Sequence, residues 1–195
     1  MRFLPALSFA SLVLATPAVA APVVVQVQAA DGTPLAGAVV TLTMPGVAAP
    51  APRGPYVMKQ QNIAFAPHVL IVPVGASVSF PNLDRVRHHV YSFSSPKRFD
   101  LKLYGREDDR SITFDRPGAV ALGCNIHDAM SGVVYVTATP YAAVTDAAGR
   151  IRLDAGAGRG TVSVWHPSIR AAGNTLSQPA TVAASGLATT LRLRR

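Results

Sequence analysis

One stretch of the sequence, Gly123-Cys124-Asn125-Ile126-His127-Asp128-Ala129-Met130, decides how the rest of the chain is interpreted. It contains the only cysteine of the chain, together with one of its 5 histidines and one of its 4 methionines. The spacing Cys-x2-His-x2-Met brings a thiolate, an imidazole and a thioether close together. This soft, mixed ligand set suits copper, whereas magnesium and calcium prefer oxygen ligands. The stretch therefore predicts a copper site.

The stretch lies between two segments with the composition of strands. Residues 119–123 precede it and residues 132–137 follow it. A tight loop between two adjacent strands can direct three side chains at one point. A fourth ligand must come from another loop, and either His88 or His89, just before the predicted strand 90–94, can supply it. Two histidines, one cysteine and a weak axial methionine form the ligand set of a blue-copper site.

The rest of the chain also has a strand-like composition. Beyond residue 20, β-branched residues alternate or cluster between Gly, Pro and Asp turn residues. No segment there shows apolar residues at the 3.6-residue period of an amphipathic helix. The fold class is therefore predicted to be all-β, built of sandwiches. The predicted strands are 23–28, 38–43, two within 64–82, 89–94, 111–114, 119–123, 132–137, 143–145, 150–153, 161–166 and 188–193.

Turns and linkers divide these strands. Asp115-Arg116-Pro117-Gly118 and Asp146-Ala147-Ala148-Gly149 each separate two predicted strands, so each is expected to close a hairpin, the first of which would deliver Cys124. Residues 45–55 are rich in Pro, Ala and Gly and predict a linker at a domain boundary. Residues 96–110 are polar and charged, with at most one short strand.

Composition limits the classes of protein that the chain can represent. A chain of 195 residues can bury a substantial hydrophobic core. A single cysteine excludes an internal disulfide, so Cys124 is an inert thiol, an intermolecular link or a ligand. The formal net charge of +8 favours acidic partners. Nucleic acid is not an expected partner, because the basic residues are scattered and the chain carries an export signal.

That signal occupies residues 1–20. Arg2 supplies the positive charge, residues 3–14 form an apolar run too short to cross a bilayer, and Ala18-Val19-Ala20 has the small residues of a cleavage site. The mature chain is expected to begin at Ala21. No later apolar run is long enough for a membrane helix, so an exported, periplasmic protein is predicted.

Two regions together resemble the cupredoxins. One contains Phe80-Pro81-Asn82 and His88-His89-Val90, and the other runs from Cys124 through Met130 into Ser131-Gly132-Val133-Val134. The Cys-x2-His-x2-Met spacing is most similar to amicyanin and its short-loop, plastocyanin-like relatives. The resemblance implies a Greek-key β-sandwich with one type 1 copper, held strongly by His88, Cys124 and His127 and axially by Met130.

The chain departs from this family at two positions. His89 stands where the family usually has an Asn that ties the two ligand loops together. Asp128 stands where short-loop relatives often have Pro, beside the histidine edge through which such proteins usually exchange electrons. The second departure affects the expected partner surface and leaves the copper site as predicted.

The flanking segments resemble a second family. Residues 31–42 (Asp-Gly-Thr-Pro-Leu-Ala-Gly-Ala-Val-Val-Thr-Leu) and 145–153 (Thr-Asp-Ala-Ala-Gly-Arg-Ile-Arg-Leu) are similar to halves of a carboxypeptidase regulatory-like, transthyretin-type sandwich. The resemblance implies that the cupredoxin is inserted into one loop of that sandwich. This resemblance implies no catalytic residues and suggests a role in docking or presentation. The combined pattern also resembles proteins labelled methylamine utilisation proteins. The predicted organisation is a signal peptide at 1–20, half of the flanking sandwich plus linker at 21–55, a cupredoxin domain at 56–138, and the second half of the sandwich at 139–195.

The predicted function is that of a periplasmic electron carrier. Its expected partners are a redox donor and acceptor, such as a cytochrome c or an amine dehydrogenase, and the expected oligomeric state is a monomer. The alternative is a copper-binding module for delivery or storage. An enzyme is not expected, because Cys124 and His127 lack a third, orienting group and no second histidine cluster offers another copper site.

Overall fold

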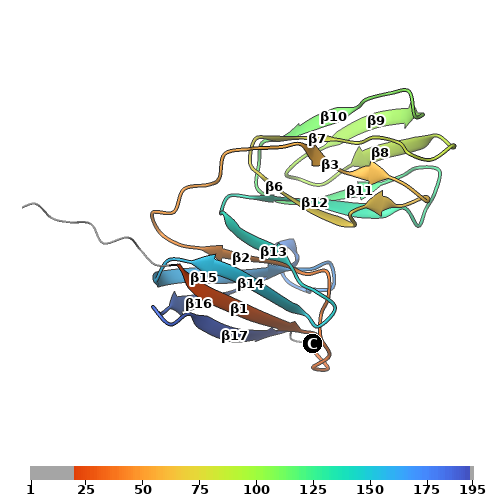
Figure 1. The fold of residues 1–195 in the computed structure, drawn as a ribbon. Helices are drawn as coiled ribbons and strands as arrows, with labels where there is room; N and C mark the ends of the chain where they lie inside the picture. The colour runs from red at the N-terminus through yellow and green to blue at the C-terminus, as the bar shows by residue number, and fades with distance from the viewer. Residues whose placement is uncertain (1–19, 194–195) are drawn as a thin grey trace, which may run out of the picture.

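The computed structural model describes residues 20–193 and shows two β-sandwiches stacked on one another (Figure 1). The predicted signal peptide, apart from Ala20, lies outside these residues. Within the described chain the only helix is a short 3-10 turn, η1 (Ala172–Asn174), and every other element is a strand. The all-β prediction is therefore confirmed. No helix of the described part is long and apolar enough to span a membrane.

The lower sandwich combines strands from both ends of the described chain. Strand β1 pairs antiparallel with β14 and parallel with β17, and β2 pairs antiparallel with both β13 and β15. One sheet has the order β14 (Arg150–Ala155), β1 (Ala21–Gln28), β17 (Leu187–Arg192). The other has the order β13 (Tyr141–Val144), β2 (Val39–Thr43), β15 (Gly158–Trp165), β16 (Thr175–Val182).

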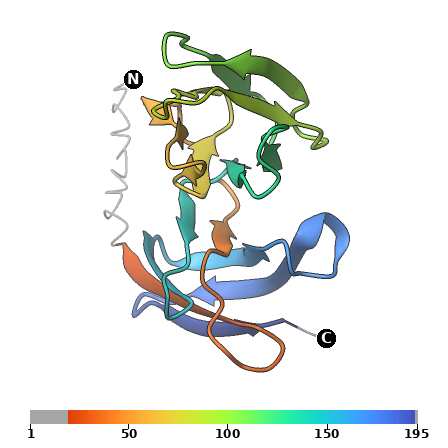
Figure 2. The ribbon, with the colours of Figure 1, turned by 90° about the vertical axis from the view of Figure 1, so that its right-hand side faces the viewer.

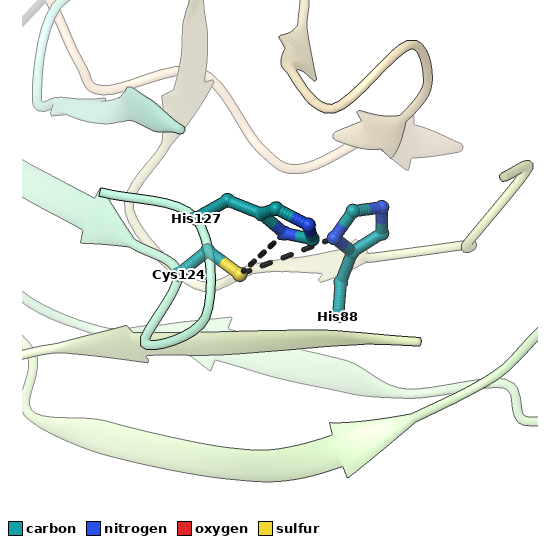
Figure 3. A group of neighbouring side chains, drawn as sticks. All are labelled: His88, Cys124 and His127. Atoms are coloured by element: carbon teal, nitrogen blue, oxygen red, sulfur yellow. Dashed lines mark hydrogen bonds between the residues drawn. The ribbon is translucent and has the colours of Figure 1, made fainter. Parts of the chain in front are cut away.

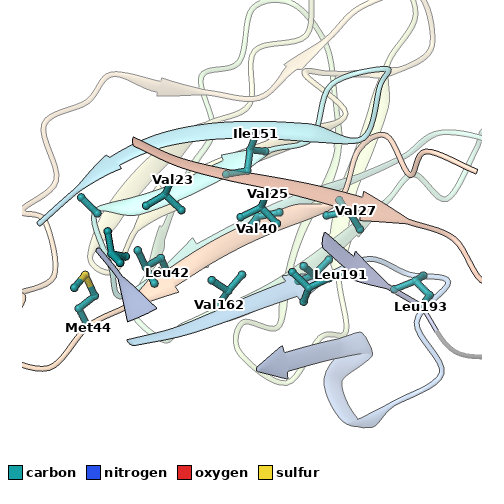
Figure 4. Packing of buried hydrophobic residues seen from close by; sticks show 14 of the residues in the cluster. Val23, Val25, Val27, Val40, Leu42, Met44, Ile151, Val162, Leu191 and Leu193 are labelled. Carbon is teal, nitrogen blue, oxygen red and sulfur yellow. The ribbon is translucent and has the colours of Figure 1, made fainter. Parts of the chain in front are cut away.

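The core of this sandwich follows from the alternation in β1. Burial along β1 switches at every residue, as the two-residue period of a strand requires, so Val23, Val25 and Val27 all face inward. They meet Val40 and Leu42 of the opposite sheet (Figure 4). Each fully buried side chain of this kind contributes about 1.5–3 kcal/mol. This packing joins the two ends of the described chain into one core.

The upper sandwich consists of strands that lie between β2 and β13 in the sequence. Its core contains the buried aromatic side chains of Phe80, Tyr104 and Phe114. A small hairpin pairs β4 (Lys59–Gln60) with β5 (Phe65–Ala66). One sheet has the order β10 (Ser111–Phe114), β7 (Ala76–Ser79), β3 (Tyr56–Val57). The other has the order β6 (Val69–Pro73), β12 (Ser131–Thr137), β11 (Gly118–Gly123), β8 (His88–Ser92), β9 (Phe99–Tyr104).

The two predicted hairpins are wrong. Strand β10 pairs with β7, whereas β11 pairs with β12 and β8 in the other sheet. In the same way β13 pairs with β2, and β14 pairs with β1. Both turns lead the chain from one sheet of a sandwich to the other. A turn motif alone does not distinguish this crossing from a hairpin, because pairing depends on which strands share a sheet.

Strand β16 was not expected from the sequence. Its segment, Thr-Leu-Ser-Gln-Pro-Ala-Thr-Val, contains few large apolar residues, and Pro179 lies inside it. Strand β16 is an edge strand that pairs only with β15 among the described strands. A proline is tolerated on an edge because its missing N–H can face solvent. The pairing with β15 therefore stabilises a segment with weak strand propensity.

The two sandwiches contact each other through a small apolar cluster. Val39 and Trp165 of the lower sandwich pack with Val133 of β12. The Tyr135 and Trp165 rings lie 5.8 Å apart at an interplanar angle of 50°. In the side view, strands of the upper sandwich lie over the sheet that contains β2 and β15 (Figure 2). Strands β11 and β12 thus border the predicted metal loop and also carry residues at the inter-sandwich contact.

We expect Gly149→Ala to destabilise the lower sandwich. Gly149 has φ +70, and an added Cβ would lie 2.5 Å from the Val27 carbonyl oxygen. The left-handed conformation and this clash should together lower the free energy of unfolding by about 2 kcal/mol or more. Urea denaturation followed by the fluorescence of Trp165, the only tryptophan, measures the change.

The matched control for this variant is Gly156→Ala. An added Cβ at Gly156 would meet nothing within 4 Å. Its effect on the free energy of unfolding should stay within about 0.5 kcal/mol. Equal losses in the two variants would contradict the importance of the conformation at Gly149.

Candidate metal centre

Three of the sequence-predicted ligands converge in the upper sandwich. The ligand atoms of His88, Cys124 and His127 all lie within 4.8 Å of one another. Cys124 Sγ is 3.9 Å from His88 Nδ1 and 3.7 Å from His127 Nδ1 (Figure 3). A transition metal with bonds of about 2.3 Å to sulfur and about 2.0 Å to nitrogen would place the sulfur roughly 3.5–3.9 Å from each nitrogen. The three side chains therefore fit around one metal ion.

The strand order of the five-stranded sheet brings these ligands together. Cys124 directly follows β11, and His88 is the first residue of the neighbouring strand β8. Gly123 pairs with Tyr91 across these two strands. At the other end of the loop, the Met130 N–H donates to the His127 carbonyl at 2.9 Å, just before β12 begins. The short loop is thus anchored at both ends by strands.

Met130 is the last residue of this loop, directly before β12. Its side chain is only 1% exposed and belongs to the same apolar cluster as Cys124. A buried thioether in the same cluster as the cysteine can serve either as an axial ligand or as part of the core. The axial role of Met130 stays a prediction.

The two neighbouring histidines point in different directions. Successive residues of a strand face opposite sides of its sheet, and along β8 His88 is buried whereas His89 is half-buried. The His89 ring lies 2.5 Å from Asp100 Oδ1 on β9 and does not belong to the cluster of His88, Cys124 and His127. Its backbone N–H instead donates to Cys124 Sγ at 3.5 Å. Position 89 therefore ties the two ligand segments together through its backbone.

Asp100, which contacts the His89 ring, also contacts Lys102. Its carboxylate also accepts a hydrogen bond from the Lys102 ammonium at 2.6 Å. The hydrogen bond from Lys102, followed by that from His89, holds the pKa of Asp100 far below its usual range. Asp100 is therefore charged at neutral pH, and it links the His89 ring to β9.

Sequence reasoning missed the residue that supports His88. Asp84 Oδ2 lies 2.9 Å from His88 Nε2, on the opposite side of the ring from the nitrogen that faces Cys124. Asn82, which is 2% exposed, accepts a hydrogen bond from the Asp84 N–H through its Oδ1. The available sequence signal was a carboxylate four residues before the histidine, within Asn82-Leu83-Asp84.

Exposure around the site is uneven. His88 and Cys124 are buried, whereas His127 is half-buried, so its ring forms the accessible edge of the cluster. The ligand loops carry exposed apolar side chains, Leu83 and Val86 before His88 and Ile126 before His127. The Asp128 side of the loop is also exposed. Access to the cluster from solvent is therefore through the His127 side.

Comparisons with known proteins gave the following results. No protein-family model matches the chain, and no curated protein matches it. Among solved structures, a copper-containing nitrite reductase (NirK) from Thermus scotoductus SA-01 is 27% identical, with a TM-score of 0.41 over 49% of this chain and 25% of that chain. The chain thus spans about a quarter of the length of the nitrite reductase.

Two smaller proteins are also similar. A purple cupredoxin from Nitrosopumilus maritimus is 24% identical, with a TM-score of 0.37 over 42% of this chain and 96% of that chain. A variant of amicyanin in its reduced Cu(I) form is 24% identical, with a TM-score of 0.40 over 50% of this chain and 99% of that chain. These likenesses cover at most about half of the present chain.

We expect His88→Ala and His89→Ala to differ in their affinity for copper. His88→Ala removes a ring nitrogen that faces Cys124, so it should weaken copper binding by more than the about 10–100-fold loss typical of residues that only support a ligand. His89→Ala leaves the backbone N–H to Cys124 in place and should weaken binding far less. Calorimetric titration with Cu(II) measures both affinities. A larger loss in His89→Ala would assign the ligand to His89 instead.

Proposed function

We propose that residues 56–138 form a cupredoxin domain that binds one type 1 copper and carries single electrons between redox partners. His88, Cys124 and His127 would be the strong ligands and Met130 the axial ligand. The observation that carries this proposal is the convergence of one cysteine Sγ and two imidazole Nδ1 atoms within 4.8 Å of one another. Cysteine and histidine are the ligands that copper prefers over oxygen donors.

The surrounding residues suit a metal site whose ligand geometry stays the same during electron transfer. Bound copper would supply the one-electron Cu(I)/Cu(II) couple. Strands β8, β11 and β12 hold the ligand segments at their ends, which restricts rearrangement when the charge of the site changes. Burial of His88 and Cys124 excludes water from one side of the cluster. An electron would enter from the donor and leave to the acceptor through the half-buried ring of His127.

The sequence and this surface together support a proposed partner and cellular location. The N-terminal sequence supports export to the periplasm. Exposed Arg85, Arg87 and Arg106 lie in or near the loop before His88 and favour a partner with acidic groups. A cytochrome c or an amine dehydrogenase is the proposed type of redox partner, and the proposed oligomeric state is a monomer. The lower sandwich would dock or present the copper domain.

The first test of this function is the visible spectrum of the chain from Ala21 after addition of Cu(II). A thiolate ligand should give an intense blue or green charge-transfer band that a reductant bleaches and an oxidant restores. Cys124→Ala should lack this band completely, because it lacks the sulfur. Bound Cu(I) without such a band would favour copper delivery or storage. Failure to bind either ion would contradict the ligand assignment.

Met130 is tested separately by Met130→Leu. Leucine is close in volume, so packing should change the free energy of unfolding by less than about 1.5 kcal/mol. If the thioether is the axial ligand, its loss should keep the charge-transfer band but raise the reduction potential, because a sulfur donor stabilises Cu(II) more than a hydrocarbon does. Redox titration of both proteins measures the shift. An unchanged potential would make Met130 a core residue only.

A further inference from the structure

The His88 ring is held between two groups. Its Nδ1 faces Cys124 Sγ at 3.9 Å, and its Nε2 lies 2.9 Å from Asp84 Oδ2. The side chain of His88 is fully buried, and that of Asp84 is 14% exposed. A carboxylate is a pure acceptor when it is ionised, so it requires the proton of a neutral ring to be on Nε2. The lone pair of Nδ1 is then directed toward the sulfur.

The Asp84 carboxylate is itself fixed by the turn between β4 and β5. The Asn62 N–H donates to Asp84 Oδ1 at 2.7 Å, and the Ile63 N–H donates to Oδ2 at 2.9 Å. The Asp84 N–H in turn donates to Asn82 Oδ1 at 2.9 Å. Two consecutive backbone N–H groups that converge on one anion form an anion-binding nest. Asp84 is thus held from three directions: by this turn, by Asn82 and by His88.

This turn adopts an uncommon backbone conformation. Asn62 and Ile63 both have φ +57, in the left-handed region. Asparagine tolerates that region, but a β-branched residue there is a genuine outlier. Two-residue hairpins of this kind usually carry glycine at the second position. Because the conformation directs both N–H groups at Asp84, binding of the carboxylate offsets the strain. Strained backbone of this kind is concentrated at functional sites.

Both oxygens of Asp84 accept hydrogen bonds. Oδ1 accepts from the Asn62 N–H, and Oδ2 accepts from the Ile63 N–H and lies 2.9 Å from His88 Nε2. The carboxylate therefore lies as an acceptor against the outer edge of the His88 ring. Such a partner makes the ring a stronger electron donor to a metal.

We propose that Asp84, clamped by the Asn62–Ile63 turn, is a positioning residue that holds His88 with its proton on Nε2 and biases the site toward Cu(II). This inference rests on the proposed copper function and adds a determinant of the reduction potential. The carboxylate increases the negative charge around the metal, which stabilises the more highly charged ion. It also restrains the ring from turning away from the metal when copper is reduced.

The tautomer of His88 can be tested without copper. In the metal-free chain from Ala21, labelled with ¹⁵N, side-chain NMR should show the His88 proton on Nε2 alone. Asp84→Ala should give a mixture of tautomers or a mobile ring. A wild-type His88 with its proton on Nδ1 would overturn the proposal, and this measurement needs no variant. A copper-loaded protein without the charge-transfer band would contradict the electron-carrier function, whereas the NMR result would still decide the role of Asp84.

The reduction potential tests the electrostatic role. Asp84→Asn keeps the shape of the side chain but removes its charge, so it should retain the charge-transfer band and raise the potential. Asp128→Asn is the matched control, because it removes an exposed carboxylate next to His127. Asp84→Glu, which keeps the charge, should restore at least part of the low potential. Equal shifts in the two asparagine variants, or no shift in Asp84→Asn, would overturn the role of Asp84. Trp165 fluorescence verifies that each variant is folded.

Discussion

The close approach of one sulfur and two ring nitrogens is the constraint on which this structure depends. These atoms come from two segments far apart in the sequence, so the site exists only where β8 and β11 are neighbours. A Cβ at Gly123, directly before Cys124, would lie 2.8 Å from the Tyr91 ring. A larger residue there would therefore require the Tyr91 side chain to move.

Strands β11 and β12 connect the site to the lower sandwich. Strands β11 and β12 border the Cys124 loop, and residues 119, 133 and 135 on them face the apolar contact with Val39 and Trp165. The lower sandwich closes its own core by pairing β1, near the start of the described chain, with β14 and β17. The upper sandwich is thus supported at the contact while the His127 edge stays accessible.

Residues outside the cluster hold His88 and Cys124 in place through hydrogen bonds. The backbone of His89 donates to the sulfur, and its ring is held by Asp100. On the other side, Asp84 links His88 to the turn between β4 and β5. Both supporting residues are carboxylates that contact a histidine, but only Asp84 contacts one that faces the sulfur. The two adjacent histidines therefore differ in their contacts because the strand directs them to opposite faces.

Local sequence determined a large part of this protein. The alternation in β1 determined an inward row of valines, and the Cys-x2-His-x2-Met spacing on a short loop placed Cys124 and His127 on one side. Tertiary structure alone decided which strands pair. It showed that the two predicted hairpins, at residues 115–118 and 146–149, do not form. The same turn residues can lead the chain either into a neighbouring strand of the same sheet or into the opposite sheet. Tertiary structure also brought Asp84 and the Asn62–Ile63 turn to the far edge of His88. Such contacts depend on sheet order and on burial, neither of which a short motif encodes.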